Sequence, residues 1–298
     1  MLKTERMDRV RAALRAQGLT QMIVCDPKSV WYLTGVAVEP YERLLALYLP
    51  TEGEPVLFLN RLFNVPEPPC RTVWHTDTDK PVAQIAEVVD AGRPLGIDKE
   101  WPAKFLIPLM ETHPGMQVVL SSDCVDDCRA CKDGEEQALM REASRINDAV
   151  NEAAKHYIKA GMTEREVAEF IDAQFRAHGC EGPSFTTIVS FGANAADPHH
   201  EPDDTVLKEG DCVLFDMGCV KSRYCSDMTR TWFCGQPTEK QAAVHDLVRR
   251  ANEAAEALIK PGVRLCELDA AARDLITEAG YGAYFNHRLG HFIGQTDH

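Results

Sequence analysis

The sequence lacks any apolar run close to the roughly 18–20 residues that a transmembrane helix needs. Residues 1–18 read as a charged amphipathic helix without the apolar centre of a secretion signal. Positive charge is also scarce, with 32 Lys and Arg against 46 Asp and Glu and a net charge of −14. This balance argues against nucleic acid, because phosphate binding needs a basic face. We expect a cytoplasmic protein without a membrane or nucleic-acid partner.

The eleven cysteines do not form a disulfide framework, because they are odd in number and scattered. They are typical of reduced thiols in a reducing compartment. Cys124, Cys128 and Cys131 have the spacing by which radical enzymes hold an iron–sulfur cluster. They follow an acidic stretch and run directly into a predicted helix, so we interpret them as linker cysteines. An iron–sulfur cluster is the alternative.

The length of 298 residues is enough for two domains, each with its own core. Residues 1–131 alternate between helical and strand patterns, which predicts an α/β domain without an obvious chemical site of its own. The pattern changes at Lys132, where a long amphipathic helix over 134–160 begins. Thr163 and Glu166 then form a capping box that starts a second helix. We therefore predict a second domain over residues 132–298.

The second domain contains an internal repeat. Residues 259–285 match residues 158–185 in their apolar positions and glycines, with Gly161 and Gly179 corresponding to Gly262 and Gly280. A repeat of this kind predicts two pseudo-symmetric halves with a site between them. The second half should continue past His298 into a hairpin like the one that follows the first half. We therefore expect the chain to be truncated at its C-terminus.

Residues 210–235 carry the clearest chemical signal. They read as two apolar strands joined by a polar turn, and each strand contains one aspartate, Asp216 or Asp227. A turn centred on Lys221 and Ser222 places these carboxylates directly opposite each other, with Cβ atoms roughly 4.5–5.5 Å apart. Because the surroundings are apolar, such a pair needs a cation or a shared proton. The hairpin therefore predicts a metal site.

Two other interpretations of the hairpin are weaker. A solvated surface hairpin would not have such apolar residues on both faces. A proton-sharing pair of the aspartic-protease type would have an Asp-Thr/Ser-Gly turn at each carboxylate, and the sequence lacks it.

Six of the ten histidines lie in the last hundred residues: His199, His200, His245, His287, His291 and His298. His287 and His291 have the spacing of a helical zinc site, but no glutamate follows His287, and Gly290 and Gly294 disfavour a helix. In an extended strand the two imidazoles would still share a face. A single histidine is more often a packing residue, but several beside an aspartate pair favour a metal site.

Four motifs resemble one known family. PHHEPDD (198–204), GDCVLFDMGC (210–219), YCSDMTRTWFCG (224–235) and HRLGHFIG (287–294) resemble the pita-bread metallopeptidases, in their Xaa-Pro aminopeptidase and prolidase branch. The segment WYLTG (31–35) resembles the creatinase-type N-terminal domain of the same branch. The resemblance implies an α/β N-terminal domain followed by an α+β pita-bread domain built from two pseudo-symmetric halves.

The resemblance also implies roles for individual residues. Asp216 would bind one metal ion, Asp227 would bridge two, and His291 would bind the second. His199 would contact the substrate or shuttle a proton, while His287 and His298 would steady the substrate carbonyl and the tetrahedral intermediate. The implied cofactor is a pair of divalent ions, with manganese favoured over cobalt or zinc because carboxylates dominate the ligands. The implied substrate is a peptide cleaved at an Xaa-Pro bond, and the implied assembly is a homodimer.

Two further glutamates complete the site in this family, and they would lie beyond His298. With three of five ligands, we expect weak metal binding and little activity. The alternative function is a catalytically inactive pita-bread module that binds a peptide or protein partner. A metal-free amidinohydrolase of the creatinase type is a third interpretation, which the retained Asp216, Asp227 and His291 disfavour.

Overall fold

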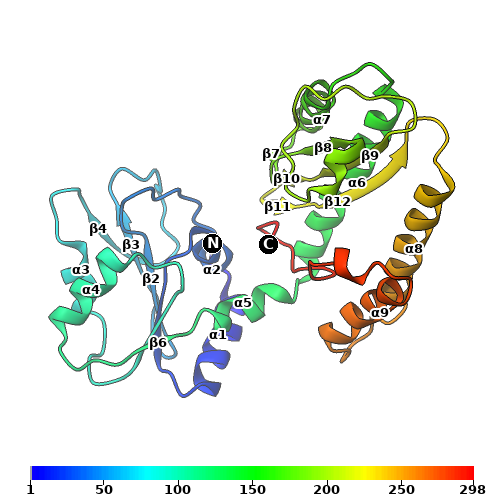
Figure 1. Ribbon diagram of the computed structural model, residues 1–298. Helices are drawn as coiled ribbons and strands as arrows, with labels where there is room; N and C mark the ends of the chain where they lie inside the picture. Colours follow the sequence, from blue (N-terminus) through cyan, green and yellow to red (C-terminus); the bar gives the residue numbers. More distant parts are fainter. Residues whose placement is uncertain (1) are drawn as a thin grey trace. The chain divides into compact units, whose positions relative to one another are not determined.

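A computed structural model describes residues 2–298 of the protein, which divide into two compact units (Figure 1). The N-terminal unit extends to Lys132, and the C-terminal unit comprises Asp133–His298. Among the described residues, no helix is both long enough and apolar enough to cross a bilayer.

The N-terminal unit is built on a six-stranded mixed sheet with the strand order β4-β3-β2-β1-β5-β6. The pairs β1–β2 and β2–β3 are antiparallel, whereas β3–β4, β1–β5 and β5–β6 are parallel. Its elements are α1 (Thr4–Ala16), β1 (Gln21–Val24), α2 (Pro27–Thr34), β2 (Ala46–Pro50), β3 (Val56–Asn60), β4 (Arg71–His75), α3 (Pro81–Ala86), β5 (Leu95–Ile97), α4 (Ala103–Thr112), β6 (Val118–Leu120) and α5 (Asp123–Ala130).

Both faces of this sheet are covered. Met22 and Val24 of β1 pack with buried residues of α1, α2 and α5, while Ile23 packs with a second cluster that includes Ile85 and Leu109 of α3 and α4. Alternate side chains of a strand point to opposite faces, and both faces are covered here, so β1 is buried along its whole length. The unit is therefore a layered α/β structure.

Two of the three clustered cysteines pack in the core of this unit. Cys124 and Cys128 lie one turn apart on α5 and are buried in the core, and Cys131 is exposed just after the helix. Burial raises the pKa of the Cys124 thiol to about 11, as expected of a thiol packed in an apolar core. Within residues 2–298 these cysteines do not form a group with metal-ligand spacing. The structure therefore gives no support to the iron–sulfur alternative.

The C-terminal unit contains two three-stranded antiparallel sheets, β12-β9-β8 and β11-β10-β7. Its elements are α6 (Gly134–Tyr157), α7 (Glu164–Ala177), β7 (Gly182–Pro183), β8 (Ile188–Phe191), the 3-10 helix η1 (Gly192–Ala196), β9 (Cys212–Met217), β10 (Cys219–Lys221), β11 (Tyr224–Cys225), β12 (Met228–Phe233), α8 (Glu239–Glu256), α9 (Leu265–Glu278) and the 3-10 helix η2 (Gly282–Tyr284). The capping box of Thr163 and Glu166 is present at the start of α7, as predicted.

Helices α6 and α7 cover one face of the β12-β9-β8 sheet. Val213, Phe215 and Met217 of β9 are buried in one cluster with residues of both helices, such as Val150 and Phe175. The residues that alternate with them, Cys212, Leu214 and Asp216, are half-buried on the opposite face. The alternation of β9 therefore separates an apolar core from a face on which Asp216 lies. Helices α8 and α9, the repeat of α6 and α7, pack together through a small cluster of their own.

The predicted register of the hairpin is wrong by one position at its turn. The residues at the turn are Ser222 and Arg223, with φ of 49° and 67°, and β9 pairs with β12 so that Asp216 lies opposite Thr229. Two consecutive residues with positive φ define the tight turn that matches strand twist, and the sequence has no Asn-Gly to mark it. Asp227 is therefore a diagonal neighbour of Asp216 rather than its direct partner. The two residues keep the same face, because the shift moves the partner of Asp216 by two positions.

Gly218 joins β9 to β10 at a point of close backbone approach. A Cβ atom there would overlap the carbonyl oxygen of Ser226 and the hydroxyl of Ser184. The backbone of Ser184 donates to the carbonyl of Gly218 over 3.0 Å, and its hydroxyl donates to the carbonyl of Ser226 over 2.8 Å. The strand switch that leads to Asp227 therefore depends on the absence of a side chain at Gly218.

We predict that Gly218→Ala lowers the free energy of unfolding of the C-terminal unit by roughly 1–3 kcal/mol, because the added methyl group must displace backbone. The matched control is Gly134→Ala at the start of α6, where no atom lies within 4 Å of the added Cβ and alanine favours the helix. Urea unfolding followed by circular dichroism measures both changes. Equal stability of the two variants would contradict the account of Gly218.

Candidate metal centre

Asp216 is held by the strand ladder. It lies near the end of β9, and its Oδ1 accepts a hydrogen bond of 2.9 Å from the hydroxyl of Thr229, its partner on β12. Asp227 lies in the short link between β11 and β12, with 23% of its side chain exposed. Because the link continues the same ladder, both carboxylates lie on the face of the sheet opposite α6 and α7.

The two carboxylates are electrostatically unfavourable on their own. Burial raises the pKa of Asp216, although the hydrogen bond from Thr229 and the nearby His291 and His298 oppose the effect. Burial also raises the pKa of Asp227, and the negative charge of Asp216 raises it further. Both groups therefore resist ionisation, which is the response expected of close, half-buried carboxylates without a cation.

His291 approaches the aspartates from the C-terminal segment. Its Nε2 lies 3.2 Å from Oδ2 of Asp227, and its ring stacks on that of His298 at a centroid distance of 3.9 Å. Its Nδ1 lies 2.8 Å from the carbonyl oxygen of Phe292, which fits an N–H donor at that position. In the neutral ring Nε2 then carries a lone pair facing a carboxylate oxygen. A cation between the two atoms would satisfy both, as metal ligation by histidine requires.

Backbone contacts bring this segment to the hairpin. The backbone N–H of Cys225 in β11 donates to the carbonyl of Gly294 over 2.7 Å. Further back, Arg273 of α9 forms a forked ion pair with Asp269 and donates to the carbonyls of Phe285 and His287. These bonds position residues that are outside any helix or strand.

The remaining predicted residues are placed less closely. His298 stacks on His291 and is near enough to lower the pKa of both aspartates. His287 is exposed, with its Nδ1 2.7 Å from the carbonyl of Arg288, and the segment it shares with His291 is not the extended strand considered above. His199 is exposed in the loop after η1. No contact of His199 or His287 with the aspartates is seen among the described residues, so their roles stay predictions.

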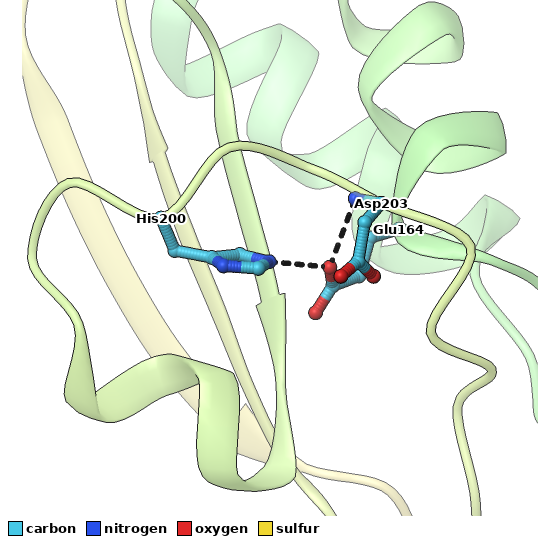
Figure 2. A group of neighbouring side chains, drawn as sticks. All are labelled: Glu164, His200 and Asp203. Carbon is cyan, nitrogen blue, oxygen red and sulfur yellow. Dashed lines mark hydrogen bonds and ion pairs between the residues drawn. The ribbon is translucent and has the colours of Figure 1, made fainter.

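A second group of polar side chains was not anticipated. Glu164, His200 and Asp203 lie together at the start of α7 (Figure 2). The sequence marked Glu166 as a capping residue and gave no role to Glu164 or His200. A glutamate directly after an N-cap is normally exposed, so only the fold, which buries Glu164 completely, reveals this group.

These three residues are the one group in the described part of the chain whose metal-ligating atoms all lie within 4.8 Å of one another. The chemistry nevertheless favours Asp216, Asp227 and His291. Both oxygens of Glu164 already accept two N–H groups each. The ligands of a two-metal site are divided between ions roughly 3.5–4 Å apart, so they need not lie within such a short mutual distance. The hairpin aspartates also have raised pKa values that a cation would relieve.

Comparison with known proteins shows the family of the chain. The family model of metallopeptidase family M24 matches residues 138–298, and that of the creatinase/prolidase N-terminal domain matches residues 6–131. The chain belongs to metallopeptidase family M24. Its C-terminal unit accordingly has the pita-bread fold, and its N-terminal unit has the creatinase-type fold, as the sequence predicts.

Similar proteins cover nearly the whole chain. An uncharacterized peptidase of Staphylococcus epidermidis is 33% identical over 97% of this chain and 83% of its own length. A prolidase of Thermococcus sibiricus superposes with a TM-score of 0.91 at 31% identity, over 99% of this chain and 83% of that protein. The dipeptidase PepE of Mycobacterium ulcerans gives a TM-score of 0.92 at 32% identity, over 99% and 81%.

We predict that Asp216→Asn stabilises the metal-free protein at neutral pH, because it removes a negative charge that burial disfavours. Both aspartates bind protons more tightly in the folded than in the unfolded chain, because their folded pKa values are raised. The stability of the wild type should therefore fall as pH rises above the normal carboxyl pKa of about 4. The advantage of the variant should disappear near pH 4.

Thermal unfolding in the presence of a chelator, from pH 7 to about pH 4, measures this effect. Asp269→Asn is the matched control with the opposite sign, because Arg273 lowers the pKa of Asp269 and the charge is stabilising there. A loss of stability in Asp216→Asn at neutral pH without metal would contradict the charge repulsion.

Proposed function

We propose that this metallopeptidase binds two divalent metal ions through Asp216, Asp227 and His291. One observation carries the proposal: two half-buried carboxylates with raised pKa values lie on one face of the ladder, with Nε2 of His291 3.2 Å from Asp227. Carboxylate-rich ligation with one imidazole favours manganese, with cobalt or zinc as alternatives. A bound pair of ions would supply an activated water and polarise the scissile carbonyl.

The protein's own residues would hold and orient this centre. Asp216 would bind one ion, with its carboxylate fixed by the hydroxyl of Thr229. Asp227 would lie between the ions and His291 would bind the second, with its ring kept in place by the stacked His298. We assign His199 to substrate contact or proton transfer, and His287 and His298 to the substrate carbonyl and the tetrahedral intermediate.

We further propose that the substrate is a peptide cleaved at an Xaa-Pro bond. The support is the similarity to a prolidase and to an Xaa-Pro dipeptidase from Bacillus anthracis, which is 27% identical with a TM-score of 0.87. We also propose that the two units are separate domains divided near residue 132, that the protein is cytoplasmic and that it forms a homodimer.

Manganese titration by calorimetry tests the assignment: Asp227→Asn should weaken binding by a factor of ten or more, because Asp227 would touch both ions. Asp246→Asn on the exposed face of α8 is the matched control and should leave binding unchanged. Equal affinity of wild type and Asp227→Asn would contradict the assignment.

Hydrolysis of Xaa-Pro dipeptides, compared with dipeptides that lack proline, tests the substrate. We expect faster turnover of the dipeptides that have proline after the scissile bond. Turnover without that preference would contradict the Xaa-Pro assignment. Peptide binding with neither metal binding nor hydrolysis would instead support the inactive binding module.

A further inference from the structure

The side chain of Glu164, the first residue of α7, is completely buried and joins several segments of the first half of the pita-bread domain. Its Oε1 accepts the backbone N–H of Phe191 over 2.7 Å and the side-chain amide of Asn194 over 3.0 Å. Its Oε2 accepts the backbone N–H of Asp203 over 3.2 Å and lies 2.6 Å from Nε2 of His200, which acts as an N–H donor to the ionised carboxylate (Figure 2). One carboxylate thus ties the start of α7 to the end of β8, to η1 and to the loop of residues 197–205.

This arrangement compensates the buried carboxylate without a metal ion. A carboxylate offers about four lone-pair sites, and four N–H groups already use those of Glu164. Glu164 also lies in the first turn of α7, where the positive end of the helix dipole stabilises its negative charge. A metal ion here would have to displace existing donors. The short bond from His200 is therefore a structural contact, and we call the pair Glu164 and His200 the clasp.

The clasp lies one residue from His199. The backbone N–H of His199 donates to Oδ1 of Asp197 over 2.9 Å, and that of His200 donates to the carbonyl of Asp197 over 3.2 Å. On the other side, the carbonyls of Asp203 and Thr205 accept backbone N–H groups from the start of α7, each over 3.1 Å. His199 thus stands between the turn at Asp197 and the clasp, in a segment outside any helix or strand.

The side chain of His200, 14% exposed, is turned inward to Glu164, whereas His199 is exposed. Neighbouring residues with opposite burial fix the orientation of the backbone between them. In the described part of the chain, the bond to Glu164 is the one side-chain hydrogen bond between residues 198–202 and α7. Its loss would let the direction of the His199 side chain vary.

We propose that His200 is a positioning residue: its bond to the buried Glu164 fixes the loop that presents His199 to the peptide substrate. The inference rests on the proposed function, which assigns His199 to the substrate. It adds a residue that does not itself touch the substrate and gives the buried Glu164 a purpose beyond the start of α7.

Hydrogen–deuterium exchange of the full chain tests the clasp without any need for activity. His200→Ala should speed exchange in residues 197–205 about tenfold or more and leave β9 and β12 unchanged, which separates local loosening from unfolding. His200→Gln, which keeps an N–H donor near the position of Nε2, should restore most of the protection. His156→Ala on the exposed face of α6 is the matched control and should have no effect on this loop. Unchanged exchange in His200→Ala would overturn the clasp.

A double-mutant cycle tests whether the clasp acts through His199. The affinity of the manganese-loaded chain for the dipeptide Ala-Pro is measured in wild type, His199→Ala, His200→Ala and the double variant. His200→Ala should weaken binding about tenfold when His199 is present and not at all when it is absent, and His200→Gln should recover most of the affinity. Independent, multiplicative losses from the two substitutions would overturn the positioning role.

The two failures are distinguishable. If the wild type does not bind the dipeptide, the proposed substrate is wrong. If His199→Ala binds it as well as the wild type, the substrate role given to His199 is wrong. In either case the positioning role falls. The exchange result would still decide whether His200 holds the loop.

Discussion

The burial of two neighbouring carboxylates on one face of a sheet is the constraint around which the candidate metal site is built. Asp216 and Asp227 lie on one face of the same ladder, half-buried, with raised pKa values. A fold gains nothing in stability from such a pair, since both burial and like charge oppose ionisation. The arrangement becomes favourable when a cation is bound, and the chain places His291 beside Asp227, where an imidazole would add a ligand.

The rest of the unit holds these side chains in place. Alternate residues of β9 fill a core beneath α6 and α7, which fixes the face on which Asp216 lies. Gly218 lies between β9 and β10, where the chain passes from one sheet to the other, and its lack of a side chain permits the close approach of the Ser226 backbone. Asp227 follows Ser226 in the link between β11 and β12. The contact between Cys225 and Gly294 then fastens the segment with His291 to the same hairpin. The site is thus built from local hairpin geometry and one long-range backbone bond.

The sequence was informative where a signal is local. The capping box at Thr163 and the alternation in β9 depend on neighbouring residues, and both are present in the structure. The register was misjudged because Ser222 and Arg223 adopt positive φ without being the usual turn residues. The prediction that both aspartates lie on one face was still correct, because the partner of Asp216 moved by two positions and side chains alternate with a period of two. The approach of His291 to Asp227 was suggested by family resemblance, not by any spacing.

The buried Glu164 was missed for a different reason. Its partners come from Phe191, Asn194, His200 and Asp203, all more than twenty residues away, and two of them are backbone N–H groups that leave no mark in a sequence. Glu164, His200 and Asp203 are residue types that also form metal sites, so this group resembles one. It differs in having its acceptor sites already filled, which only the three-dimensional arrangement reveals.

Anomalous diffraction from crystals soaked in manganese tests the central claim most directly, because it locates the ion without reference to activity. The account predicts an anomalous peak within coordination distance of Asp216, Asp227 or both, on the side of His291. A peak bounded by Glu164, His200 and Asp203 with none at the hairpin would contradict it, as would soaked crystals in which both aspartates bind no ion.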